Sequence, residues 1–240
     1  MHNLQIRSEE LIDALSATTR VSSTYLTECA RRLREAERGD SEPLYFREKK
    51  GPDSPLQGTR QAANLVFAAL QTVPARSLPG AIERAEHTRV RYDSDAYLNL
   101  TDPQAASWFR FDLPQREPPK GHELTLCRLI DSGVSFIRAI EFCIVAAWRA
   151  PDDFEATWTP MKLLYDGDRN EGRVIADYVG RDRSSDPLTL RYVDEGLPEI
   201  RLGVHRESWL TADVIAEVGR AFRFAEARRA RPERRKSYGA

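Results

Sequence analysis

The chain has 240 residues, of which 41% are hydrophobic and 30% are charged, and its formal net charge is −1. A chain of this length and composition folds into one or two globular domains, which excludes a disordered or fibrous protein. The longest unbroken apolar run, residues 142–148, is much shorter than the roughly 18 residues of a membrane-spanning helix. The first residues also lack the pattern of a signal peptide, so we expect a cytoplasmic protein with no membrane contact.

Sequence motifs for metals, cofactors and catalysis are missing. Cys29, Cys127 and Cys143 are widely spaced in apolar surroundings, which is typical of buried core residues. The four histidines are too scattered to form a local pair of metal ligands. The chain has no glycine-rich phosphate loop, no dinucleotide-binding glycine pattern and no Gly-x-Ser-x-Gly motif. We therefore predict no metal, no cofactor and no catalytic role.

Charge is unevenly distributed along the chain. Residues 1–91 carry 14 Lys/Arg against 12 Asp/Glu, residues 92–219 carry 14 against 23, and residues 220–240 carry 8 against 2. All four tryptophans fall between residues 92 and 219, which favours a separate core there. The sequence thus predicts an α+β protein: a helical domain at 1–91, an acidic α+β domain at 92–228 that dimerises or binds a partner, and a basic flexible tail at 229–240.

The first segment reads as a series of helices. Ser8 is placed to cap a short helix whose apolar stripe is Leu11, Ile12 and Leu15. Ser22 and Ser23 are placed to cap a longer helix at 24–37 that Gly39 ends. A brief strand at 44–47, an exposed loop at 48–55, a core helix at 60–72 capped by Thr59, and a short helix at 80–87 follow.

The second segment reads mainly as strands. Apolar residues on one parity predict a strand at 133–149, although the spacing of Phe136, Ile140, Ile144 and Trp148 also fits a helix. A turn at 150–153 would lead to another strand at 154–158. Strands at 161–165, 173–179, 188–193 and 200–205, separated by turn residues, predict an antiparallel sheet. Helices are expected at 124–131 and from residue 211 to Pro232.

The pattern from Leu11 to Leu33 carries the functional hypothesis. A short helix, a brief turn with Val21 near its end, two hydroxyls and a longer helix with an arginine-rich outer face match the helix-turn-helix plan. Arg20 stands where many such turns have glycine. Hydroxyls at a helix start bind phosphate, and Thr, Glu and Arg side chains read base edges. The candidate DNA-binding residues are Ser22, Ser23, Thr24, Thr27, Glu28, Arg31, Arg32, Arg34, Arg47, Lys49, Lys50 and Arg60.

Residues 4–75 resemble the winged-helix domains of prophage-encoded DNA-binding proteins. The resemblance rests on Leu11 to Leu15, on Val21-Ser22, on Leu26 to Ala36, and on the basic loop followed by Thr59 to Leu65. It implies a regulatory protein of phage or mobile-element type that reads double-stranded DNA with the helix at 24–37. A homodimer is expected, because two recognition helices multiply the affinity of one small module.

Three other interpretations remain open from the sequence. The first helices could be a hairpin used for packing or dimerisation. The chain could be a non-enzymatic interaction module, an inhibitor or assembly factor, whose acidic domain docks on a basic partner. An acidic and aromatic stretch with Asp93, Asp95, Asp102 and Asp112 could serve a metal-dependent nuclease, although a solvated acidic face explains it better. The segment from Asp166 to Gly172 resembles a calcium loop, but a hairpin turn fits its spacing better.

Overall fold

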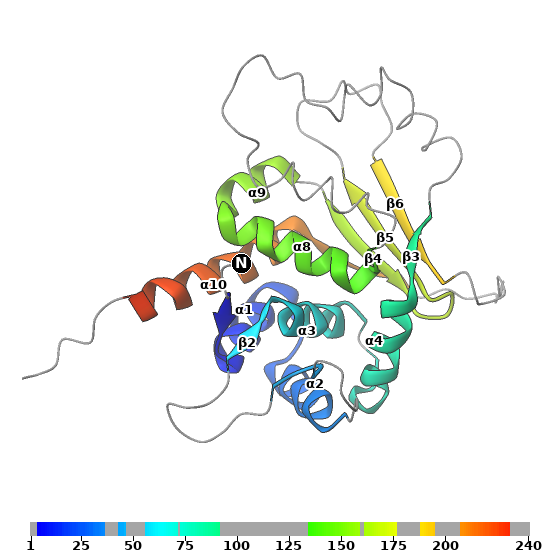
Figure 1. Cartoon of the computed structure of the whole chain (residues 1–240), viewed down its shortest axis with the longest axis horizontal. Coiled ribbons are helices and arrows are strands. Elements are labelled where there is room, and N and C mark those ends of the chain that lie inside the picture. Colours follow the sequence, from blue (N-terminus) through cyan, green and yellow to red (C-terminus); the bar gives the residue numbers. More distant parts are fainter. Residues whose placement is uncertain are drawn as a thin grey trace, which may run out of the picture.

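The computed structural model describes residues 4–36, 43–46, 56–71, 73–91, 134–158, 161–176, 188–194 and 207–230. Its architecture is mixed α+β, with helices at the N-terminus and an antiparallel sheet beside them (Figure 1). The coarse fold class predicted from the sequence is therefore confirmed.

The N-terminal helices are held together by a two-stranded ribbon. In chain order the elements are β1 (Gln5–Ile6), α1 (Ser8–Thr19), α2 (Ser23–Glu35), β2 (Gln57–Gly58), α3 (Thr59–Gln71), the 3-10 helix η1 (Ala75–Ser77) and α4 (Leu78–His87). Strands β1 and β2 pair antiparallel, which brings the segment before α1 next to the start of α3. All four predicted α-helices of this segment are confirmed within a few residues at their ends.

The start of α1 differs from the prediction. Arg7, not Ser8, is the N-cap, and its backbone N–H donates to the Glu10 carboxylate at 3.3 Å. Ser8 is buried, and its hydroxyl is hydrogen-bonded to the hydroxyl of Tyr45 at 2.9 Å. The serine therefore joins two segments of the chain instead of capping a helix, a role that a local sequence pattern does not reveal.

The predicted strand at 44–47 is wrong for the residues that the structure describes, 43–46. The side-chain amide of Gln57 accepts from the N–H of Phe46 at 3.0 Å and donates to its carbonyl at 3.2 Å. Asn64 donates to the Leu44 carbonyl at 2.9 Å. These amides satisfy the backbone in place of a neighbouring strand, because buried N–H and C=O groups need partners.

The sheet has five strands, all antiparallel, in the order β3-β6-β5-β4-β7. Their bounds are β3 (Arg89–Arg91), β4 (Lys162–Asp166), β5 (Glu171–Ala176), β6 (Leu188–Val193) and β7 (Glu207–Thr211). The predicted strands at 161–165, 173–179 and 188–193 are confirmed as β4, β5 and β6. Strand β7 was not predicted. The strand expected at 200–205 and the helix expected at 124–131 lie outside the described residues.

One face of the sheet packs against helices. Tyr165, Gly172 and Tyr192 are register partners across β4, β5 and β6, and the Phe136 ring lies against them. A Cβ atom at Gly172 would come within 2.3 Å of the Phe136 Cδ2 atom. Glycine is therefore required there to let an aromatic ring approach the sheet backbone.

Two predicted strands in the second segment are helices. Residues 136–149 form α8 (Phe136–Arg149), and residues 151–158 form α9 (Pro151–Trp158). Ser135 caps α8 by accepting from the Arg138 N–H at 3.3 Å. Because α8 is buried on most of its circumference, apolar residues fill most of its even-numbered positions as well as the helical spacing, and the even-numbered residues alone resemble one face of a strand. Pro151 begins α9 with two acids in its first turn, where the helix dipole favours them.

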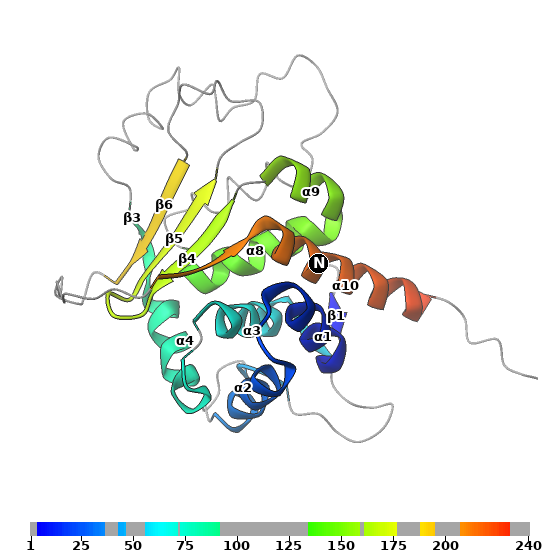
Figure 2. The same cartoon turned by 180° about the vertical axis from the view of Figure 1, so that it is seen from behind.

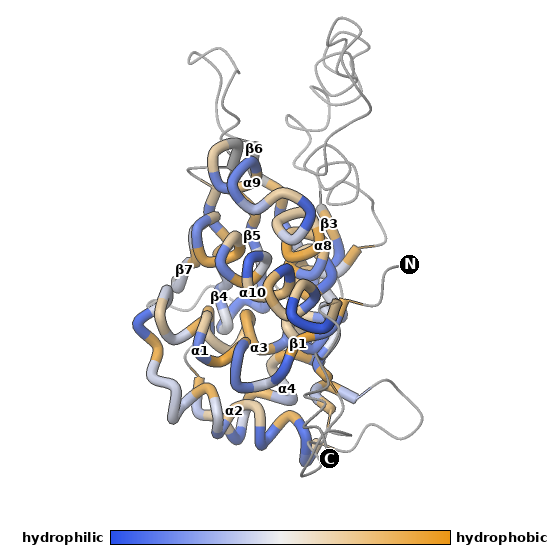
Figure 3. The backbone as a smooth tube through the Cα atoms, turned by 90° about the vertical axis from the view of Figure 1, so that its left-hand side faces the viewer, coloured by the Kyte–Doolittle hydropathy of each residue, from blue (hydrophilic) through white to orange (hydrophobic). Residues whose placement is uncertain are grey.

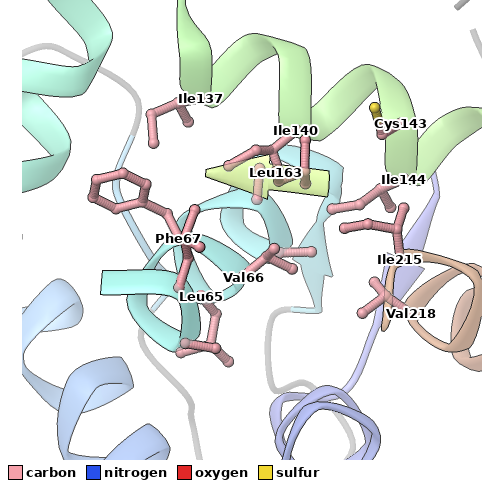
Figure 4. Packing of buried hydrophobic residues seen from close by; sticks show 14 of the residues in the cluster. Leu65, Val66, Phe67, Ile137, Ile140, Cys143, Ile144, Leu163, Ile215 and Val218 are labelled. Atoms are coloured by element: carbon pink, nitrogen blue, oxygen red, sulfur yellow. The ribbon is translucent and has the colours of Figure 1, made fainter. Parts of the chain in front are cut away.

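The central core lies where α3, α8, α10 (Ala212–Ala230) and β4 meet (Figure 4). Val66, Ile140, Leu163 and Ile215 come from these four elements and are buried together. The helices α8 and α10 cross so closely at Gly219 that an added Cβ would lie 2.5 Å from the Ala147 carbonyl carbon. The predicted long helix from residue 211 is confirmed as α10.

The buried residues of the first segment and of the later segments form one continuous cluster. The predicted domain boundary at residue 91 coincides with the last residue of β3, which is already an edge strand of the sheet. Viewed from behind, the N-terminal helices sit directly below α8 and α10 (Figure 2). The described parts of the two predicted domains therefore share their hydrophobic core.

Candidate nucleic-acid interface

The helices α1 and α2 are joined by a three-residue turn. Arg20 adopts the left-handed conformation, with φ 59° and ψ 9°. The Thr19 hydroxyl donates to the Leu15 carbonyl at 2.6 Å and accepts from the Val21 N–H at 3.2 Å. Ser22 then caps α2 by accepting from the Tyr25 N–H at 3.2 Å. The turn thus keeps the backbone shape that glycine commonly provides, although arginine occupies the position.

Helix α2 has a buried face and an outward face. Leu26, Cys29, Ala30 and Leu33 are buried, and the helix packs against α1, α3, α4 and η1. The alternation of apolar and polar residues along α2 is visible at one end of the molecule (Figure 3). We define the outer surface of α2 by the residues on the opposite, exposed or half-exposed side: Ser23, Thr24, Thr27, Glu28, Arg31, Arg32 and Glu35.

The charged side chains of this outer surface pair with each other. Arg31 donates from Nε to Glu28 Oε2 at 2.7 Å and from Nη1 to Glu35 Oε1 at 2.5 Å. Arg32 donates from Nε to Glu28 Oε1 at 2.9 Å. The bonds from Arg31 chiefly, with those from Arg32, lower the pKa of Glu28 to about 2, and the same pairs raise the pKa of Arg31. Two arginines and two glutamates therefore make the outer surface polar but neutral.

Two of the predicted DNA-binding residues point into the protein. Arg34 donates from Nη2 to the Ser8 hydroxyl at 3.2 Å, and its guanidinium lies over the Tyr45 ring, 5.4 Å from the centroid. Arg60 pairs with Glu86 at 2.6 Å, and its side chain is only 21% exposed. These arginines bind segments of the fold and do not contribute to the outer surface. Arg47, Lys49 and Lys50 lie outside the described residues.

Two exposed arginines next to α2 were not among the predicted residues. Arg20 lies in the turn before α2, and Arg76 lies in η1, which packs against α2. The Tyr25 hydroxyl donates to the Val73 carbonyl at 2.6 Å and so joins the first turn of α2 to the segment that leads into η1. Burial chiefly, with a bond to Cys29, raises the pKa of this tyrosine. No local pattern connects Arg76 with α2, since more than 40 residues separate them.

Several of the described acidic residues gather around one arginine. Asp152, Glu155 and Glu217 surround Arg220, which lies 2.8 Å from Asp152 and 2.6 Å from Glu155. These pairs raise the pKa of Arg220. On the sheet, Glu171 binds Arg191 through two hydrogen bonds of 3.0 Å each. Three carboxylates therefore share one guanidinium, which leaves this cluster acidic, whereas Glu171 is neutralised by its pair with Arg191.

The other candidate sites predicted from the sequence have structural roles, as far as the structure describes their residues. The segment from Asp166 to Glu171 is the turn of the β4–β5 hairpin, as predicted, and Asp166 accepts from the N–H groups of Asp168 and Arg169 at 3.0 and 3.1 Å. Cys29 and Cys143 are buried free thiols. No cluster of three metal-ligating side chains occurs among the residues placed by the structure. The acidic stretch with Asp93, Asp95, Asp102 and Asp112 lies outside them.

The predicted basic tail begins inside a helix. Arg229 and Ala230 are the last residues of α10, and residues 231–240 lie outside the described part. Arg229 donates from Nη2 to the Gln5 carbonyl at 2.7 Å, and Arg228 forms an ion pair with Glu10. Arg228 thus binds α1, and Arg229 binds β1.

Comparison of the chain with protein-family models, curated proteins and solved structures gives no match. In the described ranges, no helix combines the length and the apolar character that crossing a membrane requires. The fold therefore defines only a class, that of mixed α+β proteins.

Proposed function

We propose that the chain is a double-stranded DNA-binding protein that inserts α2 into the major groove. The observation that carries the proposal is the second helix of a tightly joined pair, whose inner face is buried and whose outward face presents hydroxyls and arginines. An α-helix fills the major groove, and hydroxyl, carboxylate and guanidinium groups match the donors and acceptors of base edges. The first turn of α2 contains no acid that would repel phosphate.

The ion pairs on the outer surface are compatible with DNA binding. Their side chains are 39–50% exposed, and exposed ion pairs are weak because water and salt screen them. The phosphate groups of DNA can therefore replace the glutamates as partners of Arg31 and Arg32. Glu28 would then be free to accept from the amino group of a cytosine, the donor that carboxylates read in the major groove.

We further propose a winged-helix type of domain and a regulatory role of phage or mobile-element type. Both rest on the resemblance of residues 4–75, and the three-residue turn and the antiparallel ribbon of β1 and β2 are compatible with them. The role is proposed as non-catalytic. A homodimer would place two copies of α2 on successive turns of DNA. Trp209 and Phe224, 61% and 66% exposed, are the large described hydrophobic side chains that a contact between copies could cover.

Arg31→Ala in the full chain tests the proposal. Fluorescence anisotropy with a labelled random-sequence duplex, titrated at salt concentrations from about 50 to 300 mM, measures the affinity and its salt slope. Loss of one phosphate contact flattens the slope by about 0.9 and weakens binding about eightfold at 0.1 M salt. Arg149→Ala removes an exposed arginine at the end of α8, away from α2, and serves as the control.

The full chain is needed because the N-terminal helices share their core with α8 and α10. Absence of duplex binding at about 50 mM salt, or equal affinities for the wild-type chain and Arg31→Ala, would refute the proposal. Equal losses of affinity in Arg149→Ala and Arg31→Ala would also refute it, because they would show that binding depends on the total charge of the chain and not on α2.

A further inference from the structure

Exposed arginines lie beside the first turn of α2 on two different segments. Arg20 belongs to the turn that precedes the helix, and Arg76 belongs to η1. Neither makes an ion pair with a carboxylate of the described residues, whereas Arg31 and Arg32 share two glutamates. Among the described residues, Arg20 and Arg76 therefore add positive charge beside α2 that its own outer surface does not supply.

The contacts of Tyr25 define where Arg76 lies. Tyr25 and Arg32 are seven residues apart, so they occupy the same flank of a helix with 3.6 residues per turn. The Tyr25 hydroxyl binds the Val73 carbonyl at 2.6 Å, and η1 begins two residues later. Arg76 is thus presented at this flank of α2, next to its N-terminal half. Arg34, on the other flank, is engaged with Ser8 and Tyr45.

Arg20 is held at the end of the helix by an unusual backbone. Its φ of 59° belongs to a conformation that residues with a Cβ atom seldom adopt. Residues kept in such conformations cluster at functional sites. The turn directs the chain straight into the N-cap of α2, so this exposed guanidinium lies next to the first turn of the helix.

We infer that Arg20 and Arg76 contact the sugar-phosphate backbone on the borders of the groove that receives α2. The inference rests on the proposed function and extends it to two residues outside the recognition helix. A helix with its side chains is roughly 10–12 Å wide and the major groove is about 12 Å wide, so phosphates border the flanks of the helix. Arginines beside the helix then meet phosphates and set its register, while residues of the outer surface reach the bases.

Charge removal at the two positions tests the inference. Arg20→Asn keeps a residue that tolerates the left-handed conformation, and Arg76→Gln keeps a long polar side chain. Each variant should flatten the salt slope for a random-sequence duplex by about 0.9 and weaken binding about eightfold at 0.1 M salt. The double variant should lose about 60-fold, because independent phosphate contacts add in free energy. Arg149→Gln, the control, should bind as the wild-type chain does.

The outcomes separate the inference from the proposed function. If the wild-type chain binds no duplex, both fail. If Arg31→Ala weakens binding but the double variant keeps the wild-type salt slope, the proposed function stands and the inference is overturned. Loss in only one of the two single variants also overturns it, because the inference requires both arginines. Circular dichroism melting of each variant must match the wild-type curve, which excludes a folding defect as the cause of lost binding.

Discussion

Replacing Glu28 with glutamine isolates the electrostatic role of the outer surface of α2. Glu28 accepts two hydrogen bonds from Arg31, at 2.5 and 2.7 Å, and one from Arg32, at 2.9 Å. Its pKa of about 2 means that it is fully ionised at neutral pH. The substitution therefore removes one complete negative charge and leaves Arg31 and Arg32 to share Glu35 alone, with almost no change in side-chain volume.

The expected result is tighter binding to DNA of random sequence. The outer surface changes from two arginines and two glutamates to two arginines and one glutamate, a change from zero to +1. One additional neutralised phosphate steepens the salt slope by about 0.9, which corresponds to about eightfold tighter binding at 0.1 M salt. A duplex that Glu28 reads through a cytosine would show a smaller gain, because the specific contact is lost at the same time.

The assay is anisotropy of a labelled random duplex with the full chain, measured over about 50 to 300 mM salt. Asp153→Asn is the matched control, because it removes one exposed negative charge from α9. Helix α9 lies on the side of the molecule opposite α2 in both cartoon views. The reasoning is refuted if Glu28→Gln binds no more tightly than the wild-type chain, or if Asp153→Asn gains as much.

Three further predictions concern pH, packing and the thiols. The pKa of Glu28 is lowered in the folded protein, so its pairing with arginine is complete above the ordinary glutamate pKa of about 4.3 and is lost only as pH falls through about 2. The gain in DNA affinity of Glu28→Gln should therefore be equal at pH 5.5 and at pH 8. Gly219→Ala should lower the free energy of unfolding, measured in urea, by about 1–2 kcal/mol. Gly80→Ala should raise it by about 0.5 kcal/mol, because the added Cβ would meet only Arg84 Nη1, at 3.7 Å. Burial raises the pKa of the Cys29 thiol, and it raises the pKa of Cys143 to about 12. Folded Cys127→Ser should therefore react with a thiol reagent at pH 8 only as fast as it unfolds.

Each of these three predictions would be contradicted by a specific result. A gain for Glu28→Gln that disappears at pH 5.5 would show that Glu28 is protonated there. Equal stability changes in the two glycine variants would contradict the close crossing of α8 and α10. A rapid reaction of one thiol in folded Cys127→Ser would contradict the burial of Cys29 or Cys143.

Local signals predicted the N-terminal helices and much of the sheet. Ser22 and the apolar spacing of Leu26, Cys29 and Leu33 were sufficient to locate α2, because capping and amphipathicity are properties of neighbouring residues. Strands β4, β5 and β6 were found through the turn residues between them. Partly polar elements at a surface carry their own periodicity, and this is why they are readable from the sequence.

Elements buried on several sides were not readable in this way. Helix α8 carries apolar residues nearly all round, so the spacing of Phe136, Ile140 and Ile144 competed with an equally good strand pattern. Strand β7 was missed for another reason, because it is a short edge strand whose Trp209 is exposed. In both cases tertiary packing decides the conformation, and the local sequence does not contain that information.

The arginines of the candidate interface illustrate the same limit. Composition could not separate Arg31 from Arg34, although one is 45% exposed on its side chain and the other lies over the Tyr45 ring. Arg60 seemed available, but Glu86 binds it from α4. Arg76 seemed unrelated to α2 until the fold brought η1 against that helix. Which cations remain for a partner depends on long-range contacts with carboxylates and aromatic rings.

The C-terminal helix links the orientation of the candidate interface to the rest of the fold. Arg228 binds Glu10 in the first turn of α1, Arg229 binds Gln5 in β1, and α10 packs along α1 and α8. Since α1 leads through a three-residue turn into α2, we expect a change in the packing of α10 against α1 to displace the outer surface of α2. Gly219→Ala should therefore lower stability and DNA affinity together, whereas Arg31→Ala lowers affinity alone. A Gly219→Ala chain that is destabilised but binds DNA with wild-type affinity would show that the interface is held without α10.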